Sequence, residues 1–255
     1  MARKKKISSE NTNKPHVNKE IPIDNVEKAS LSSFSLFTNE NQQQLLSLGR
    51  EKAKIVASYI AKSQEELDTD IDLALEEAHK AVKMASRLAL TRETLGLAAY
   101  RAGLWKLAIS EFRTAHRING SHDYLPVIAD SFRGLGLPEK VFEMAGTKEA
   151  SELDDETHAE MAIVLAGAYS DQGNLKKAQQ TLNREYRKKG LPALTRLRIR
   201  EAQATFFEKF GKTEDADKIL QATETARTKM VEHNTTKMSN DFIVYETIEE
   251  ERNED

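Results

Sequence analysis

The side chains that most often carry out catalysis are scattered along this sequence rather than clustered. Histidines occur at positions 16, 79, 116, 122, 158 and 233, and no two are three or four residues apart, as two metal ligands on one helix face would be. The chain has no cysteine, which excludes a thiol nucleophile, a disulfide and a cysteine-bound zinc. We therefore expect no catalytic residue, no metal site and no cofactor, and we predict that the protein is not an enzyme.

Two short segments partly match known motifs but fit helix ends better. Gly134-Leu135-Gly136 has two of the three glycines of a dinucleotide-binding loop, but Pro138 follows where that loop would continue, and no strand is expected before it. Asp154 and Asp155 precede an expected helix that starts near Glu156, where the helix dipole favours negative charge. We interpret the first segment as a turn between helices and the second as a helix cap.

A cluster of cationic residues surrounds the expected loop at Leu191-Pro192. Cations at the end of a helix are favoured by its dipole, which accounts for the first members without a function. Arg196 and Arg200 are four residues apart and therefore share a face of the next helix. The alternative is a patch that binds an acidic protein, RNA or the acidic C-terminal segment of this chain. The cluster consists of Arg184, Arg187, Lys188, Lys189, Arg196 and Arg200.

Composition and charge favour a helical core with polar ends. Apolar residues make up 39% of the 255 residues and charged residues 31%, and the net charge is −3. The first 20 residues are rich in lysine, whereas residues 241–255 hold seven acidic groups against Arg252 alone. We expect disordered tails at 1–37 and 234–255 around a domain at 38–233, because such segments bury too little apolar area to fold.

The sequence also bears on localisation. The basic start is not followed by the apolar core of a secretory signal. The longest apolar-rich run, from Met161 to Tyr169, is far short of the ~20 residues that span a bilayer. We therefore expect a cytoplasmic protein with no membrane partner.

Between residues 38 and 233, amphipathic helices recur with a regular period. Gly103, Gly136, Gly173 and Gly211 stand 33, 37 and 38 residues apart, and we interpret each as the turn between two antiparallel helices. Small or apolar residues at fixed distances from each glycine would let the paired helices approach closely. Such a period predicts an all-α stack of helical repeats. The packing residues are Gly96, Ala108, Phe112, Ala166, Ala178, Ala204 and Ala216.

This pattern resembles the tetratricopeptide repeat over roughly residues 50–229. Two positions depart from the family pattern. Gly120 stands where the family usually has proline, and Pro126 lies early in an expected first helix. The segment from Thr91 to Ala145 is similar to an uncharacterised group of actinobacterial tetratricopeptide proteins. The resemblance implies a right-handed α-solenoid of about five helical hairpins. Its signature positions hold Leu95, Gly96, Ala99, Gly103, Ala108, Phe112 and Ala115, with Trp105 at the common aromatic position.

The resemblance also implies where a partner would bind, because first helices form the concave face in this family. The expected groove is mixed in charge with an apolar middle, and it lacks the Lys/Asn arrangement that clamps a C-terminal carboxylate in some members. Its residues are Glu93, Leu97, Tyr100, Arg101, Val127, Asp130, Arg133, Ile163, Val164, Gly167, Ser170, Arg198, Glu201 and Thr205.

Taken together, these features predict a scaffold or adaptor that binds a peptide or protein partner in the concave groove. The alternative is an RNA- or ribosome-associated factor that uses the basic N-terminal tail and the 184–200 patch. A small apolar cluster of Phe34, Leu36 and Phe37 precedes Thr38, a fair N-cap. We expect this cluster to dock on the first helix, with a linear motif for a partner as the alternative.

Overall fold

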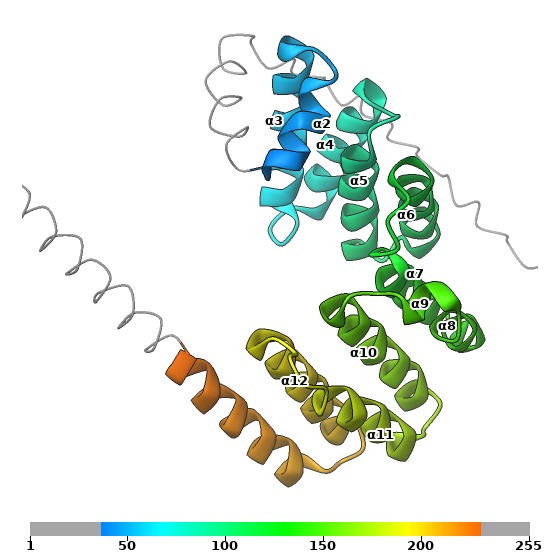
Figure 1. Cartoon of the computed structure of the whole chain (residues 1–255), viewed down its shortest axis with the longest axis vertical. Coiled ribbons are helices and arrows are strands. Elements are labelled where there is room, and N and C mark those ends of the chain that lie inside the picture. The colour runs from blue at the N-terminus through cyan, green and yellow to red at the C-terminus, as the bar shows by residue number, and fades with distance from the viewer. Residues whose placement is uncertain (1–36, 231–255) are drawn as a thin grey trace, which may run out of the picture.

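The structure is a computed structural model that describes residues 37–230, and every regular element in that range is a helix (Figure 1). The predicted all-helical class is confirmed. No helix of the described range is both long and apolar enough to cross a bilayer. The predicted tails lie almost wholly outside the described residues. The helices are α2 (Asn39–Leu46), α3 (Arg50–Glu66), α4 (Ile71–Met84), α5 (Ala89–Arg101), α6 (Trp105–Asn119), α7 (Leu125–Gly134), α8 (Pro138–Ala145), α9 (Lys148–Ser151), α10 (Asp155–Asp171), α11 (Leu175–Tyr186) and α12 (Ala193–Lys209), followed by helical residues 213–230.

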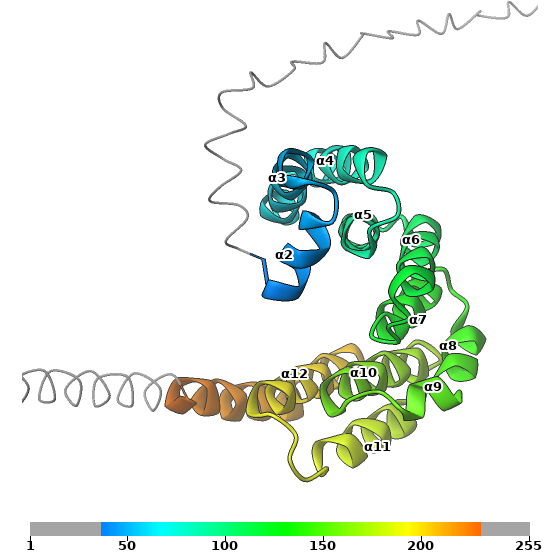
Figure 2. The same ribbon diagram turned by 45° about the horizontal axis from the view of Figure 1, so that its top comes forward.

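Helices that are neighbours in the sequence are also neighbours in space. α3 packs on α4, α5 on α6, α7 on α8 and α10 on α11, and each pair contacts the next through α4–α5, α6–α7, α8–α10 and α11–α12. Figure 2 shows the pairs following a curve, with α5, α7, α10 and α12 toward its inner side and α4, α6, α8 and α11 toward its outer side. α2 lies on the inner side at one end of the curve.

Four of the inner helices end in the same way. Gly103, Gly136, Gly173 and Gly211 have φ values of 71°, 73°, 77° and 72°, a left-handed conformation that favours glycine. Each glycine amide donates to the carbonyl three residues earlier, and the next amide donates to the carbonyl five residues earlier, all at 2.8–3.0 Å. This pair of bonds is the Schellman motif, which terminates a helix and reverses the chain. The same local sequence therefore makes the same turn four times.

The helix pairs meet through small side chains. The residue five positions after each of the four turn glycines is fully buried, as is Ala74 in the α3–α4 pair. In α5, Gly96 faces the ring of Phe112 so closely that an added Cβ would lie 3.0 Å from it. Close approach of this kind requires small residues at fixed positions, which accounts for the regular pattern in the sequence. The buried positions after the turns are Ala108, Val141, Ala178 and Ala216, and Ala129, Ala166 and Ala204 are equally buried in the first helices.

The N-terminal end of the described chain is anchored by α2. The Thr38 hydroxyl accepts from the Asn41 amide at 3.3 Å and caps the helix. Phe37 is 9% exposed and packs with Leu45 and Ile60 in the core of the first helix pair. Phe37 therefore docks on the helices that follow it, whereas Phe34 and Leu36 lie outside the described residues.

Candidate functional site

The inner side of α5 carries a stripe of residues spaced one turn apart. Glu93 accepts a hydrogen bond from the Tyr124 hydroxyl, just before α7, and Arg101 forms an ion pair with Asp68, just after α3. Leu97 lies between Glu93 and Arg101 on the stripe and is 36% exposed. The stripe thus bridges the preceding and following helix pairs and leaves one large apolar side chain accessible between its charged ends.

A chain of polar contacts continues from α5 across three further helix pairs. The Tyr100 hydroxyl donates to Asp130, whose Oδ1 accepts from Arg133 Nε at 2.7 Å. A guanidinium nitrogen of Arg133 donates to Asp171 Oδ2 at 2.9 Å, and Lys209 Nζ donates to Asp171 Oδ1 at 2.6 Å. We call these five residues the polar ladder. Its two carboxylates balance its two cations, so it joins α5, α7, α10 and α12 without a net charge.

The protein environment shifts the ionisation of the ladder. Burial raises the pKa of Tyr100, and its hydrogen bond to Asp130 raises that pKa further. Burial alone would raise the pKa of Asp171, but hydrogen bonds from Lys209 and Arg133 outweigh it, so the pKa falls below its usual value of 3.8. At neutral pH the Tyr100 hydroxyl is therefore a neutral donor and Asp171 an ionised acceptor.

Two other carboxyl groups on the inner helices have raised pKa values, in contrast to Asp171. Burial raises the pKa of Glu93 above 4.5, and the charges of Glu40 and Asp123 raise it further against the hydrogen bond from Tyr124. Burial also raises the pKa of Glu160, which Arg198 opposes. Ionising Glu93 or Glu160 in the folded state therefore carries a cost that ionising Asp171 does not.

Further ion pairs link the last helices. Arg198 on α12 contacts Glu160 on α10 at 2.7 Å, and Arg227 in the final helix contacts Glu201 on α12. Each of these pairs joins a residue to one in an adjacent helix. Most charges predicted for the groove are therefore engaged with neighbouring helices. Thr205, by contrast, is exposed, and among residues 37–230 its hydroxyl donates only to a carbonyl of its own helix, that of Glu201.

The expected apolar middle of the groove is mostly packing surface. Ser170 is 2% exposed and enclosed by the protein, so its assignment to the groove is wrong. Val127, Ile163 and Val164 are half-buried and pack against the apolar clusters between helices. Among the predicted apolar groove residues, Leu97 has the most accessible side chain.

Sequence reasoning missed two members of the ladder, Asp171 and Lys209. A signal for them exists, because positions 133, 171 and 209 are spaced 38 residues apart and carry alternating charge. Gly167 completes the arrangement, since an added Cβ there would lie 3.3 Å from Arg133 Cδ. The absent side chain leaves room for Arg133 to cross to Asp171.

The predicted basic patch divides into two groups. Arg196 donates to the carbonyls of Tyr186, Lys188 and Leu191, and therefore holds the α11–α12 loop together from within. Arg200 lies 4.4 Å from the Tyr186 ring centroid. Lys188 Nζ is 2.8 Å from the buried carboxylate of Glu185 and 2.9 Å from Nδ1 of His158. These three cations have structural partners.

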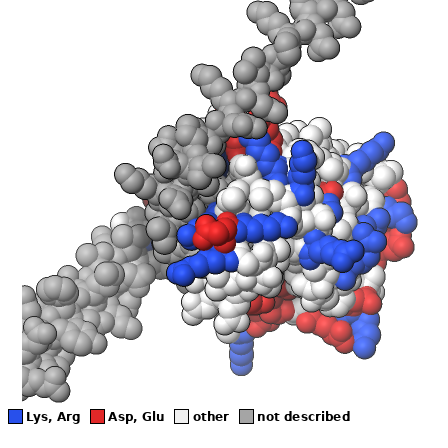
Figure 3. Space-filling view, turned by 90° about the horizontal axis from the view of Figure 1, so that it is seen from above, with Lys and Arg blue, Asp and Glu red and all other residues white. Residues whose placement is uncertain are grey.

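The other three cations of the patch point to solvent. Arg184, Arg187 and Lys189 are exposed, and within residues 37–230 none of them forms an ion pair, a hydrogen bond through its side chain or a contact with an aromatic ring. We call them the outward cations. Figure 3 shows one face of the molecule, on which Lys and Arg are interspersed with Asp and Glu and with uncharged surface.

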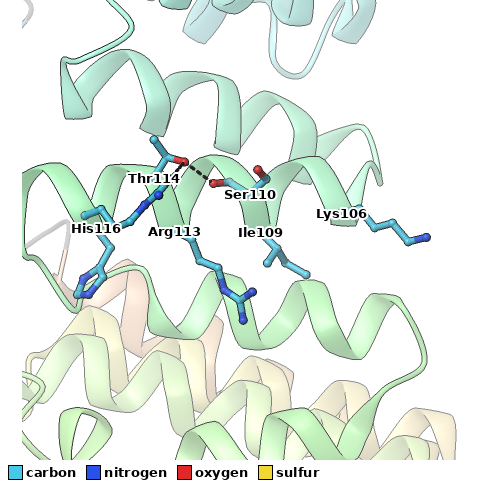
Figure 4. Close-up of a pocket in the computed structure, with 7 residues that line it drawn as sticks. Lys106, Ile109, Ser110, Arg113, Thr114 and His116 are labelled. Carbon is cyan, nitrogen blue, oxygen red and sulfur yellow. Dashed lines mark hydrogen bonds between the residues drawn. The ribbon is translucent and has the colours of Figure 1, made fainter.

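Two hollows lie along the outer helix α6, away from the inner side. The larger has a volume of about 560 Å³ and is lined by α6 alone, with Ile109 and Arg113 pointing to the same side of the helix (Figure 4). The smaller, of about 310 Å³, continues from it past His116 and His122 toward Met144 and Glu149. In the described part of the chain, no three His, Asp or Glu side chains are placed to hold a metal ion. Neither hollow brings together a set of residues for a reaction.

Comparison with known proteins finds no matching protein family, no matching curated protein and no matching solved structure.

Proposed function

We propose that this protein is a tetratricopeptide-like α-solenoid that acts as a scaffold and binds a peptide or protein segment along its inner face. The observation that carries the proposal is the fourfold repetition of one helix ending at near-constant spacing. Identical endings on successive helix pairs orient each pair on the last in a similar way, and stacks of this kind present an extended concave surface. Figure 2 supports the proposal, because the helices with these endings line the inside of the curve.

In this proposal the polar ladder prepares the surface rather than holding the partner. Its charges already balance one another, so a partner does not have to neutralise them. A surface whose side chains are fixed before binding loses less conformational entropy when a partner arrives. Affinity then comes from apolar contact at Leu97, while Glu93 and Arg101 on either side set the orientation of the bound segment.

A pair of matched variants tests this site. Leu97→Asp places a charge on the inner face, and Ile118→Asp places one on α6, where Ile118 has a similar exposure of 41%. Peptides are selected from a random displayed library on the full wild-type chain, and their affinities for both variants are then measured. We expect Leu97→Asp to weaken binding at least tenfold, about 1.4 kcal/mol, and Ile118→Asp to leave it unchanged. Peptides that bind all three chains equally would contradict the proposed face.

The second candidate, a factor that binds RNA, has one supporting observation. The outward cations have no counter-charge in the described part of the chain. Three neighbouring cations without partners are available to contact the phosphates of a nucleic acid. Against it, the other half of the predicted patch is engaged in internal contacts. The peptide-binding scaffold therefore remains our first proposal.

A further inference from the structure

The outward cations, Arg184, Arg187 and Lys189, stand at the end of α11 and in the loop between α11 and α12, and a large exposed apolar side chain follows that loop. Leu194, in the first turn of α12, is 65% exposed, more than any other large apolar residue of the described chain. The internal contacts of Arg196 hold the loop that joins the cations to Leu194, at 2.7 Å to Lys188 O and 3.1 Å to Leu191 O. The surface is therefore a fixed combination of positive charge and apolar area, and not a flexible run of lysines.

The chain leaves the described structure at the end of a helix that packs along α12. Residues 213–230 run back along α12, and the ion pair between Arg227 and Glu201 ties the end of this helix to α12. Figures 1 and 2 both show the last described helix running along α12 and extending past the end at which α12 starts. The 25 residues that follow position 230 therefore start at the same end of the helix stack as the loop between α11 and α12.

The composition of that segment complements the surface. Residues 241–255 contain seven acidic groups and one arginine. Phe242, Ile243, Val244, Tyr245 and Ile248 precede the acidic run at 249–251. The ten residues from 231 to 240 can span about 33–36 Å when extended, which gives the acidic segment access to the loop. Both the charge and the apolar content of the segment therefore match what the surface exposes.

We propose that residues 241–255 dock on the outward cations and Leu194 of the same chain. The acidic side chains face Arg184, Arg187 and Lys189, and an apolar side chain of the segment covers Leu194. Tethering makes weak contacts sufficient, because a short linker gives the segment an effective concentration in the millimolar range. Any acidic partner or nucleic acid that uses this surface must displace the segment. The proposal does not depend on peptide binding at the inner face.

A labelled peptide of residues 241–255 tests the docking on full-length chains. In one chain the native segment is weakened by Glu249→Gln, Glu250→Gln and Glu251→Gln. We expect the peptide to bind this chain at least tenfold more tightly than wild type, because the intact tethered segment competes in wild type. The affinity should fall as salt is added, since exposed charges are screened.

Charge reversal identifies the surface. Adding Arg184→Glu, Arg187→Glu and Lys189→Glu to the weakened chain should abolish peptide binding. The matched control, Lys52→Glu, Lys83→Glu and Lys106→Glu, reverses three exposed lysines elsewhere and should retain it. Circular dichroism of every chain confirms that each variant is folded.

Several results would overturn the proposal. The first is that the peptide binds wild type and the weakened chain with equal affinity. The second is that peptide binding survives reversal of the outward cations, and the third is that it is lost in the control. Dimers of wild type that dissociate when the acidic run is neutralised would show docking between chains instead. An RNA oligonucleotide that binds the outward cations equally in wild type and the weakened chain would show that the segment does not occupy them.

Discussion

Replacement of Gly96 by leucine probes the contact on which the α5–α6 pair depends. An added Cβ would lie 3.0 Å from Phe112 Cε2 and 3.1 Å from two other ring carbons, well inside the 3.5–4.0 Å of a normal carbon contact. Phe112 is 5% exposed, and the Tyr124 ring lies 5.7 Å from its centroid, so the phenyl ring has little room to move. The helices themselves must therefore separate.

The cost follows from two opposing effects. Overpacking a core costs about 1–3 kcal/mol, whereas replacing glycine in a helix returns about 1 kcal/mol. Gly96→Ala is therefore expected to cost about 0–2 kcal/mol. Leucine adds three more carbons to the same contact, and we expect a loss of about 3 kcal/mol. For a chain of this size that corresponds to a melting temperature lower by about 6–12 °C.

Thermal melts followed by circular dichroism measure the loss, and the fluorescence of Trp105, the single tryptophan, reports on the same helix pair. Ala222→Leu adds the same bulk at an exposed helical position and should leave the melting temperature unchanged. Phe112→Ala combined with Gly96→Leu should be less destabilising than the sum of the two single changes by at least about 1 kcal/mol. A Gly96→Leu protein that melts with wild type, or exact additivity in the double variant, would refute the proposed contact.

Two predictions concern pH. The folded pKa of Asp171 is lowered, so the stability it contributes is present above its usual value of 3.8 and is lost as the pH falls through the folded pKa. We expect Asp171→Asn to cost up to about 1 kcal/mol at pH 6 in low salt, with the gap to wild type closing below pH 4; a gap independent of pH would contradict the ion pairs. The folded pKa of Glu93 is raised, so its ionisation destabilises the fold above its usual value of 4.5. The Glu93→Gln protein should therefore have a higher melting temperature than wild type at pH 7 and the same melting temperature at pH 4. A lower melting temperature for Glu93→Gln at pH 7 would show that the charge of Glu93 stabilises the fold.

Local signals predicted much of the fold correctly. The turn at Gly173 is an example. A glycine between two stretches with an apolar stripe predicts a helix end, and both hydrogen bonds of the Schellman motif at Gly173 lie within six residues. Thr38 likewise caps α2 as its residue type suggests. These features depend on residues close together in the sequence, so the rest of the protein is not needed to infer them.

The candidate site was harder to predict, because it depends on how one helix pair rotates on the next. Ser170 has the spacing of a groove residue, yet it is buried. Arg196 belongs to a run of cationic residues that predicts a surface patch, yet its side chain donates to three carbonyls of the α11–α12 loop. Small changes of helix rotation exchange exposed and covered positions, and the spacing within one helix carries no information about that rotation.

The amino-acid order by itself determined that the described chain is helical, where four helices end and which small residues lie between them, because capping and side-chain size act over a few neighbouring residues. Only the tertiary structure decided which charges are matched internally, as in the contact of Arg133 with Asp171, and which are left exposed, as at Lys189. The physical reason is that an ion pair between residues 38 apart forms only when packing has brought two helices to the correct distance and rotation.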